Sequence, residues 1–135
     1  PKNFPLWADV VAKLKAHGIR ITQIGLAHED PIGADEFLTN LPLKQIEELV
    51  PQAHTWVAVD NFFPHLCNIV GRPGVVIFGK SDPLIFVFFL NVNLLKSREH
   101  LRHQQFDIWE TEQFDPNVFV GSDEVVSSII KLIKE

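Results

Sequence analysis

At the middle of the chain stands the stretch Trp56-Val57-Ala58-Val59-Asp60-Asn61-Phe62-Phe63-Pro64-His65-Leu66. A short apolar run stops at an acid, and a proline and a histidine follow at once. This pattern predicts a buried strand that is followed by a helix. In an open parallel sheet, ligands bind outside the carboxyl ends of the strands, beside the N-termini of the helices that follow. The polar residues of this stretch therefore stand where a binding site is expected.

Helix and strand patterns occur on both sides of this stretch. Apolar residues at helical spacing indicate three helices, and a fourth is expected from Ser122 as N-cap, with a stripe of Val125, Val126, Ile129, Ile130 and Ile133. Short β-rich or fully apolar runs indicate four strands. The predicted helices are 5–17, 42–50, 64–70 and the one after Ser122, and the predicted strands are 19–26, a short one around 37–38, 56–59 and 75–78.

Two later segments give weaker patterns. Leu84 to Leu90 is either a strand or a buried extended loop, and Ser97 to Gln105 is expected to form a polar helix. Read as β-α-β-α-β-α-β, the order of elements predicts an α/β fold. We expect one domain over residues 1–135, a three-layer α/β/α Rossmann-like parallel sheet with helices on both faces.

Composition limits the classes of function. The 135 residues fit one domain, and 46% hydrophobic with 21% charged residues is ordinary for a globular protein. With a net charge of −5 and 12 basic residues that form no patch, we expect no nucleic-acid partner. One cysteine fits a reducing compartment. No apolar run is long enough to span a bilayer and no signal peptide is visible, which favours a cytoplasmic protein with at most peripheral membrane contact.

The first candidate site is the end of the central strand. Asp60, Asn61 and His65 lie at a predicted helix N-terminus, which suits a phosphate or pyrophosphate. The alternative is that Asp60 or Asn61 only caps the helix and His65 packs against Trp56. Phe62 and Phe63 could stack on a base or sugar ring, or close over the core.

Other candidates follow two further strands. In Phe78-Gly79-Lys80-Ser81-Asp82-Pro83 the glycine allows close backbone approach, and Lys80 and Ser81 could meet phosphate oxygens. An ordinary strand-to-loop turn explains the same residues. Glu29 lies in the loop after strand 19–26, where a solvated acid is the alternative, and Lys2 precedes the first helix, where a charge at a frayed terminus is the alternative.

Two remaining features point to structure rather than chemistry. His100 and His103 have i, i+3 spacing, but a metal would need further ligands, so no metal site is predicted. Cys67 stands among apolar neighbours and is expected to be a small core residue.

Several of these segments resemble one family in order and spacing. Lys2-Asn3-Phe4-Pro5 resembles the K-x-W-P segment that opens the C-terminal domain of heptosyltransferase-type glycosyltransferases (family nine, GT-B fold). Ile24 to Glu29 is similar to that family's strand and acid-bearing loop, and Leu41 to Ile46 to a helix start. Asp60 to Leu66 resembles a D-S/T-G-x-x-H-L motif. Gly71-Arg72-Pro73 resembles G-x-P, and Phe78 to Pro83 resembles F-G-x-T-D-P. The resemblance runs from Lys2 to Pro83, about 60% of the chain.

The resemblance implies a donor-binding domain, one half of a GT-B fold. In the family this domain holds a nucleotide-diphosphate sugar, ADP-heptose in the best-known members. It implies that Lys2 and Glu29 help to hold phosphate and nucleoside groups, that Asp60 contacts sugar hydroxyls, and that the loop from Asn61 to His65 faces the pyrophosphate. No cofactor or metal is required. The catalytic base, an acid, belongs to an N-terminal acceptor domain that this chain lacks.

Two functions follow as hypotheses. The first is the donor-binding half of a glycosyltransferase that acts on lipopolysaccharide or another cell-surface glycan. Phe62 stands where the family has glycine and Asn61 where it has a hydroxyl residue. These departures, and the lack of an acceptor domain, motivate the second: a catalytically inactive stand-alone α/β module for nucleotide binding or protein interaction. Because an interface would be exposed in a half domain, we also expect self-association through Leu84–Leu90 or Phe62-Phe63.

Overall fold

A computed structural model of the chain describes residues 4–59, 61–80, 91–101 and 116–134. The helices are α1 (Trp7–Ala16), α2 (Leu43–Leu49), α3 (Phe62–Val70) and α5 (Ser122–Lys134), with 3-10 turns η1 (Val50–Gln52), η2 (Arg98–His100) and η4 (Pro116–Val118). The strands are β1 (Thr22–Gly25), β2 (Glu36–Thr39), β3 (Val57–Val59), β4 (Val75–Phe78) and β5 (Val92–Leu95). None of the described helices has the length and apolarity needed to cross a membrane.

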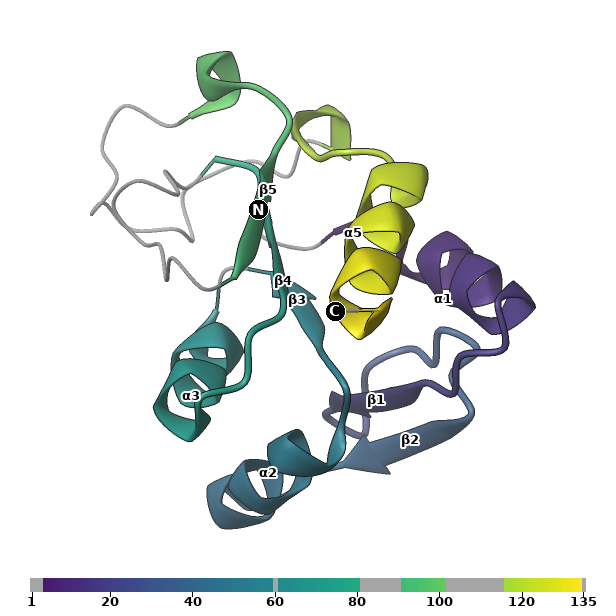
Figure 1. Ribbon diagram of the computed structural model, residues 1–135, viewed down its shortest axis with the longest axis vertical. Coiled ribbons are helices and arrows are strands. Elements are labelled where there is room, and N and C mark those ends of the chain that lie inside the picture. The colour runs from purple at the N-terminus through teal and green to yellow at the C-terminus, as the bar shows by residue number, and fades with distance from the viewer. Residues whose placement is uncertain (1–3, 60, 81–90, 102–115, 135) are drawn as a thin grey trace.

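Every strand pairing in the described residues is parallel. β1 pairs with β2, and β4 lies between β3 and β5. We expected one sheet, but the hydrogen bonds between strands define two separate sheets, one of two strands and one of three. Figure 1 shows the β1–β2 pair turned away from the direction of β3. No helix separates β1 from β2, because residues 26–35 form an irregular loop. The breakers in 28–33 predicted that loop, and the strands predicted at 19–26 and around 37–38 are confirmed on either side of it. The summary order β-α-β-α-β-α-β, which puts a helix between the first two strands, is wrong here.

The β3–β5 sheet is covered by helices on both faces, as Figure 1 shows. Strand β4 is fully buried, and its residues alternate between two cores. Val75 and Ile77 belong to the core with α1 and α5, whereas Val76 and Phe78 belong to the core with α2 and α3. A strand that is apolar at every position is expected where both faces of a parallel sheet are covered. The structure is thus an α/β fold compatible with a Rossmann-like layout.

Helix ends follow local chemistry. Gly18 and Gly71 lie just past α1 and α3 with φ of 78° and 86°, the left-handed conformation that ends helices at little cost for glycine. The second helix stops as predicted, because α2 ends at Leu49 and Pro51 lies in the 3-10 turn that follows. The spacing of Leu43, Ile46 and Leu49 predicts that all three face inward. For Leu43 that prediction is wrong: it is 55% exposed, and Leu41 packs on the core instead.

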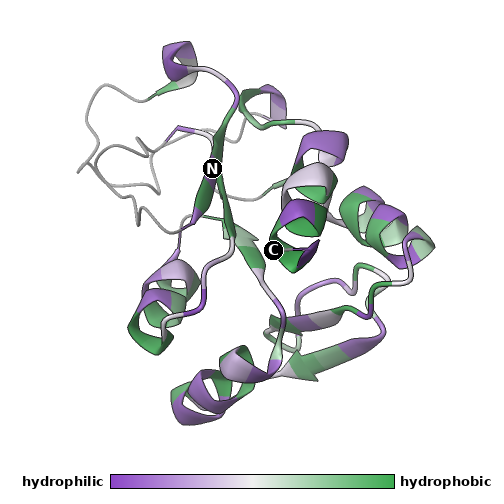
Figure 2. Cartoon of the chain, in the orientation of Figure 1, coloured by the Kyte–Doolittle hydropathy of each residue, from purple (hydrophilic) through white to green (hydrophobic). Residues whose placement is uncertain are grey.

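The last part of the chain differs most from expectation. Strand β5 was not predicted, and Leu84–Leu90 lies outside the described residues. The polar helix expected from Ser97 is wrong over its described part, because only one 3-10 turn forms and Leu101 is extended at φ −64° and ψ 139°. The α5 stripe is confirmed: Val125, Val126 and Ile129 are buried. Figure 2 shows the corresponding alternation of apolar and polar residues around the helices.

Candidate functional site

The carboxyl ends of β3, β4 and β5 form one edge of the second sheet. The strands are in parallel register, with Val59 opposite Ile77 and Phe78 opposite Leu95. Residues that follow the three strands therefore lie along that edge. Asn61 follows β3, Gly79 and Lys80 follow β4, and Lys96 follows β5. The edge is where an open parallel sheet binds its ligands.

Asn61 is the N-cap of α3. Its side-chain Oδ1 accepts a hydrogen bond of 2.9 Å from the backbone N–H of Phe63. The capping alternative is confirmed for Asn61, and the cap explains why the helix begins at Phe62 rather than at Pro64. Pro64 stays in the first turn, where a missing N–H is harmless.

This cap reduces what the helix can offer to a phosphate. Four backbone N–H groups at a helix N-terminus have no intrahelical partner. In α3 they belong to positions 61–64, and Pro64 has none while the N–H of Phe63 is bound by Asn61. At most the amides of Asn61 and Phe62 are left for a ligand.

The two phenylalanines have different environments. Phe63 is half-buried, and its ring lies edge-to-face with Trp56 at 5.7 Å between centroids and 83° between planes. Phe62 is 58% exposed at the first position of the helix. Phe63 thus closes over the core and packs on Trp56, the role that the capping alternative gave to His65. The His65 side chain is exposed.

Gly79 is needed for packing. A Cβ at this position would lie 2.8 Å from Val118 Cγ2 and 2.9 Å from a ring carbon of Phe119. The close approach that glycine permits is therefore to the segment before α5, not to a ligand. Lys80 beside it is half-exposed at the strand end.

Glu29 stabilises the loop after β1. Its Oε1 accepts a hydrogen bond of 3.0 Å from the Leu26 N–H, and its carboxylate lies against Gly25, where a Cβ would come within 3.1 Å of Oε2. Asn40, just after β2, has a φ of 54° and accepts a hydrogen bond of 3.4 Å from the Ala27 N–H. These two side chains satisfy backbone amides of the same loop.

The described candidates fall into two places. Asn61, Phe62, His65 and Lys80 lie at the edge of the second sheet, whereas Glu29 lies at the end of β1 in the first sheet. Lys2, Asp60 and Ser81 lie outside the described residues, as does His103.

Two residues at the strand ends were missed by the sequence reasoning. Lys96 is exposed after β5, and its Nζ donates a hydrogen bond of 2.9 Å to the carbonyl of Asn117. The sequence pattern that could have identified Lys96 is the alternation of polar and apolar residues from Asn91 to Leu94. It has the period of two typical of a strand and would have placed Lys96 just after a strand end. Asn40 was missed as well, although asparagine tolerates the left-handed conformation that it adopts here.

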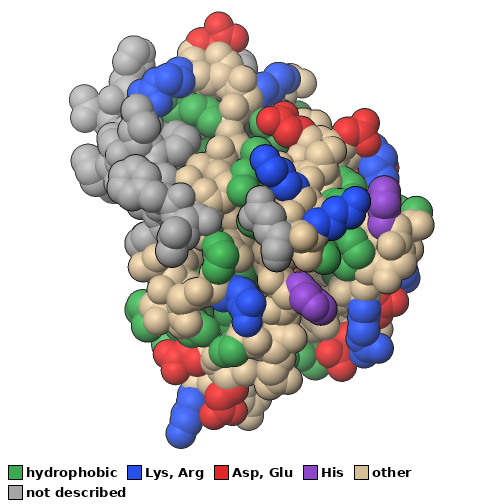
Figure 3. Space-filling view, in the orientation of Figure 1, with side chains coloured by type: hydrophobic (Ala, Val, Ile, Leu, Met, Phe, Trp, Pro, Cys, Tyr) green, Lys and Arg blue, Asp and Glu red, His purple; other side chains and the backbone are tan. Residues whose placement is uncertain are grey.

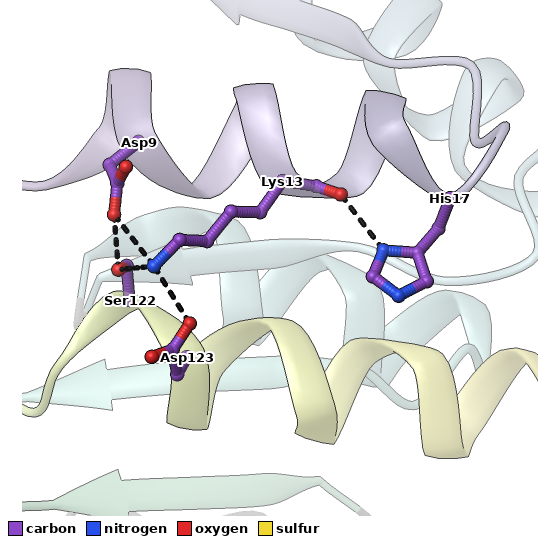
Figure 4. A network of polar contacts seen from close by, with 5 residues as sticks. All are labelled: Asp9, Lys13, His17, Ser122 and Asp123. Atoms are coloured by element: carbon purple, nitrogen blue, oxygen red, sulfur yellow. Dashed lines mark hydrogen bonds and ion pairs between the residues drawn. The ribbon is translucent and has the colours of Figure 1, made fainter.

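A second polar cluster joins the first and last helices (Figure 4). Lys13 Nζ on α1 lies 2.8 Å from Ser122 Oγ, 2.7 Å from Asp123 Oδ1 and 3.1 Å from Asp9 Oδ2, and the Ser122 hydroxyl donates to Asp9. The N-cap prediction for Ser122 is wrong, because Ser122 is already the first helical residue and its hydroxyl is used in this cluster. His17 Nδ1 lies 2.9 Å from the Lys13 carbonyl and takes no part in it.

The cluster has the wrong protonation states for nucleophilic catalysis. The hydrogen bond from Ser122, and then that from Lys13, lower the pKa of Asp9. The hydrogen bonds to Asp123 and Asp9 raise the pKa of Lys13. An acid with a lowered pKa and a lysine with a raised pKa are both weak general bases at neutral pH. We interpret the cluster as a structural link between α1 and α5.

Cysteine and metal chemistry receive no support from the described residues. Cys67 is fully buried, as expected of a core residue, and burial raises the pKa of its thiol to about 12. Within the described ranges no three histidine, cysteine, aspartate or glutamate side chains gather where they could hold a metal ion.

Comparison with known proteins gives no match. No protein-family model, no curated protein and no solved structure matches this chain.

Proposed function

We propose that this chain is the donor-binding half of a heptosyltransferase-type glycosyltransferase, one half of a GT-B fold. It would bind a nucleotide-diphosphate sugar, in the cytoplasm, for transfer to lipopolysaccharide or another cell-surface glycan. One observation carries the proposal. Three segments on which the resemblance rests, at Glu29, at Asn61 to His65 and at Gly79-Lys80, each follow the carboxyl end of a parallel strand.

In the proposed reaction an acceptor hydroxyl displaces the nucleoside diphosphate. The acceptor oxygen forms a bond to the anomeric carbon, the bond from that carbon to the diphosphate oxygen breaks, and a base takes the hydroxyl proton. The resemblance assigns that base to the other domain. The role of this chain is therefore to bind and orient the donor, with Lys80 beside the diphosphate as a cation.

Calorimetric titration tests the proposal. We expect ADP, UDP or GDP, or one of their sugar conjugates, to bind the chain. Lys80→Gln should weaken that binding about 10- to 150-fold, since a hydrogen bond to a charged group is worth roughly 1.5–3 kcal/mol. Lys44→Gln, which removes an exposed lysine from α2, is the matched control. If none of the six ligand types binds this chain or a longer form of the protein, the proposal is wrong.

One observation favours the second candidate function, an inactive α/β module that binds nucleotides or proteins. The start of α3 has at most two free amides, and Phe62 covers the point where the resemblance places glycine. The two functions differ in the coding sequence upstream of Pro1. A second α/β pattern of roughly 100–200 residues there would argue against the stand-alone module.

A further inference from the structure

The ring of Phe62 is an exposed apolar surface at the proposed donor site. It belongs to the first residue of α3, three positions after the last residue of β3, and 58% of the residue is exposed. Apolar residues that are singly exposed are common and need no function. Phe62 differs from such residues because it stands at a capped helix start, beside the carboxyl end of a parallel strand, where open sheets bind their ligands.

One hydrogen bond to the backbone and one ring contact position Phe62. The Asn61 cap sets the backbone of the first turn of α3, and the Phe62 ring lies edge-to-face with Phe63 at 6.4 Å between centroids and 86° between planes. Phe63 is held in turn by Trp56, which is buried. In an edge-to-face pair at most one face of each ring is covered by the other ring. Phe63 therefore does not cover at least one face of the Phe62 ring, and another aromatic group could stack on that face.

The chemistry around Phe62 favours a nucleobase over the other parts of a donor. A phosphate needs donors, and α3 has at most two amides to give. Sugar hydroxyls need several polar partners, and the Asn61 oxygen is already used by the Phe63 N–H, which leaves only the Nδ2 group of this side chain. A nucleobase needs only a flat apolar face, because every base has a π-face that stacks on aromatic side chains.

We infer that Phe62 is a donor-binding residue whose ring stacks on the base of a nucleoside diphosphate. This inference rests on the proposed function and names the part of the donor that the first residue of α3 contacts. It replaces the role implied by the resemblance, in which backbone at this position approaches the pyrophosphate. The diphosphate is then left to Lys80 at the end of the neighbouring strand.

The test compares ADP, UDP, GDP, their sugar conjugates and inorganic pyrophosphate on the full chain by calorimetry. Phe62→Leu keeps an apolar side chain but removes the π-face, and should weaken the binding nucleoside diphosphate about 5- to 150-fold, the range for one stacked base. Phe62→Tyr should keep the affinity, and pyrophosphate should bind both variants equally. The control is Ile69→Ala. Ile69 is 80% exposed and lies two turns further along α3, so this variant shows the effect of removing an exposed apolar side chain from the same helix.

Each other outcome overturns a defined statement. Equal binding of the nucleoside diphosphate by Phe62→Leu and the wild type overturns the stacking inference while leaving the proposed function intact. Equal weakening of pyrophosphate also overturns it, because Phe62 would then act through the backbone. If Phe62→Leu weakened the binding of nucleotide sugars but not that of nucleoside diphosphates, the ring would contact the sugar and the inference that it stacks on the base would be wrong. Failure of both the wild-type chain and a longer form of the protein to bind any of the nucleotides overturns the proposed function itself.

Discussion

Single residues in this protein are constrained by their immediate neighbours, and Gly74 is the clearest case. A Cβ on Gly74 would lie 2.3 Å from two atoms of the Trp56 indole and 2.6 Å from the Trp56 carbonyl oxygen. The indole cannot easily retreat, since its Nε1–H donates a 2.7 Å hydrogen bond to the Arg72 carbonyl. We expect Gly74→Ala to destabilise the fold by about 1–3 kcal/mol, the usual cost of overpacking. Urea unfolding measures the change.

The matched control for that substitution is Gly121→Ala. Nothing lies within 4 Å of a Cβ at Gly121, and its φ is not in the left-handed region. A Gly74→Ala variant as stable as Gly121→Ala would show that the Trp56 indole moves aside at no cost, contrary to the packing described above.

Asn61 provides a second test at the level of one side chain. Asn61→Ala removes the acceptor for the Phe63 N–H and should lower the free energy of unfolding by about 1 kcal/mol. Asn61→Asp should keep most of the stability, because aspartate caps equally well and its charge suits a helix N-terminus. Asn68→Ala, an exposed asparagine later in α3, is the control. Equal stability of Asn61→Ala and Asn68→Ala would contradict the capping role.

Whole elements depend on links such as the Asp9–Lys13–Ser122–Asp123 cluster between α1 and α5. The pKa of Asp9 is lowered from 3.8 by Ser122 and Lys13, so this carboxylate stabilises the fold above about pH 4. That contribution is lost as pH falls through the lowered pKa. The pKa of Lys13 is raised from 10.5, so its contribution is complete below that pH and is lost only in stronger alkali.

We therefore expect the melting temperature to fall on acidification below about pH 4, and to fall less steeply in Asp9→Asn. The variant should also be less stable at pH 7, where the wild-type carboxylate is charged. Glu47→Gln on α2 is the control, and it should keep the wild-type acid slope. If the melting temperature fell equally steeply with pH in Asp9→Asn and in the wild type, Asp9 would not contribute to the loss of stability in acid.

Elements with a continuous apolar stripe or a fully apolar run were predictable from the sequence. The stripe of α5 and the run of β4 each match their burial, because periodicity reports which faces are covered. Strand β5 was missed because the strand in this part of the chain was predicted at the more apolar run Leu84–Leu90. The helix expected from Ser97 is wrong at Leu101, because no local sequence pattern indicated its extended backbone.

The same limit applies to the candidate site. The rule for parallel sheets predicted that Asn61 and Lys80 would lie at strand ends. Whether a polar residue there binds a ligand or satisfies the backbone depends on partners that sequence spacing does not identify. Glu29 turned out to accept from the Leu26 N–H, and Gly79 to make room for Val118 and Phe119 from a distant segment.

At the scale of the whole molecule, charge is dispersed while apolar residues gather on α3. Figure 3 shows acidic and basic side chains interspersed over one face. The nine residues of α3 include no acid, lysine or arginine, and Phe62 and Ile69 are 58% and 80% exposed. Seven positions apart, they lie on one side of the helix. Two copies could therefore meet along α3 without like-charge repulsion between the helices.

We expect weak, concentration-dependent self-association through this side of α3. Two exposed side chains cover far less than the roughly 800 Å² per partner of a stable interface, so the dimer should form only at high concentration. Light scattering over a concentration series measures it, and Phe62→Ser with Ile69→Ser should shift the protein to monomer. Leu6→Ser, at an exposed leucine before α1, should not. A wild-type chain that stays monomeric at high concentration would show that α3 needs no partner. Association unchanged in the double variant would assign it to another surface.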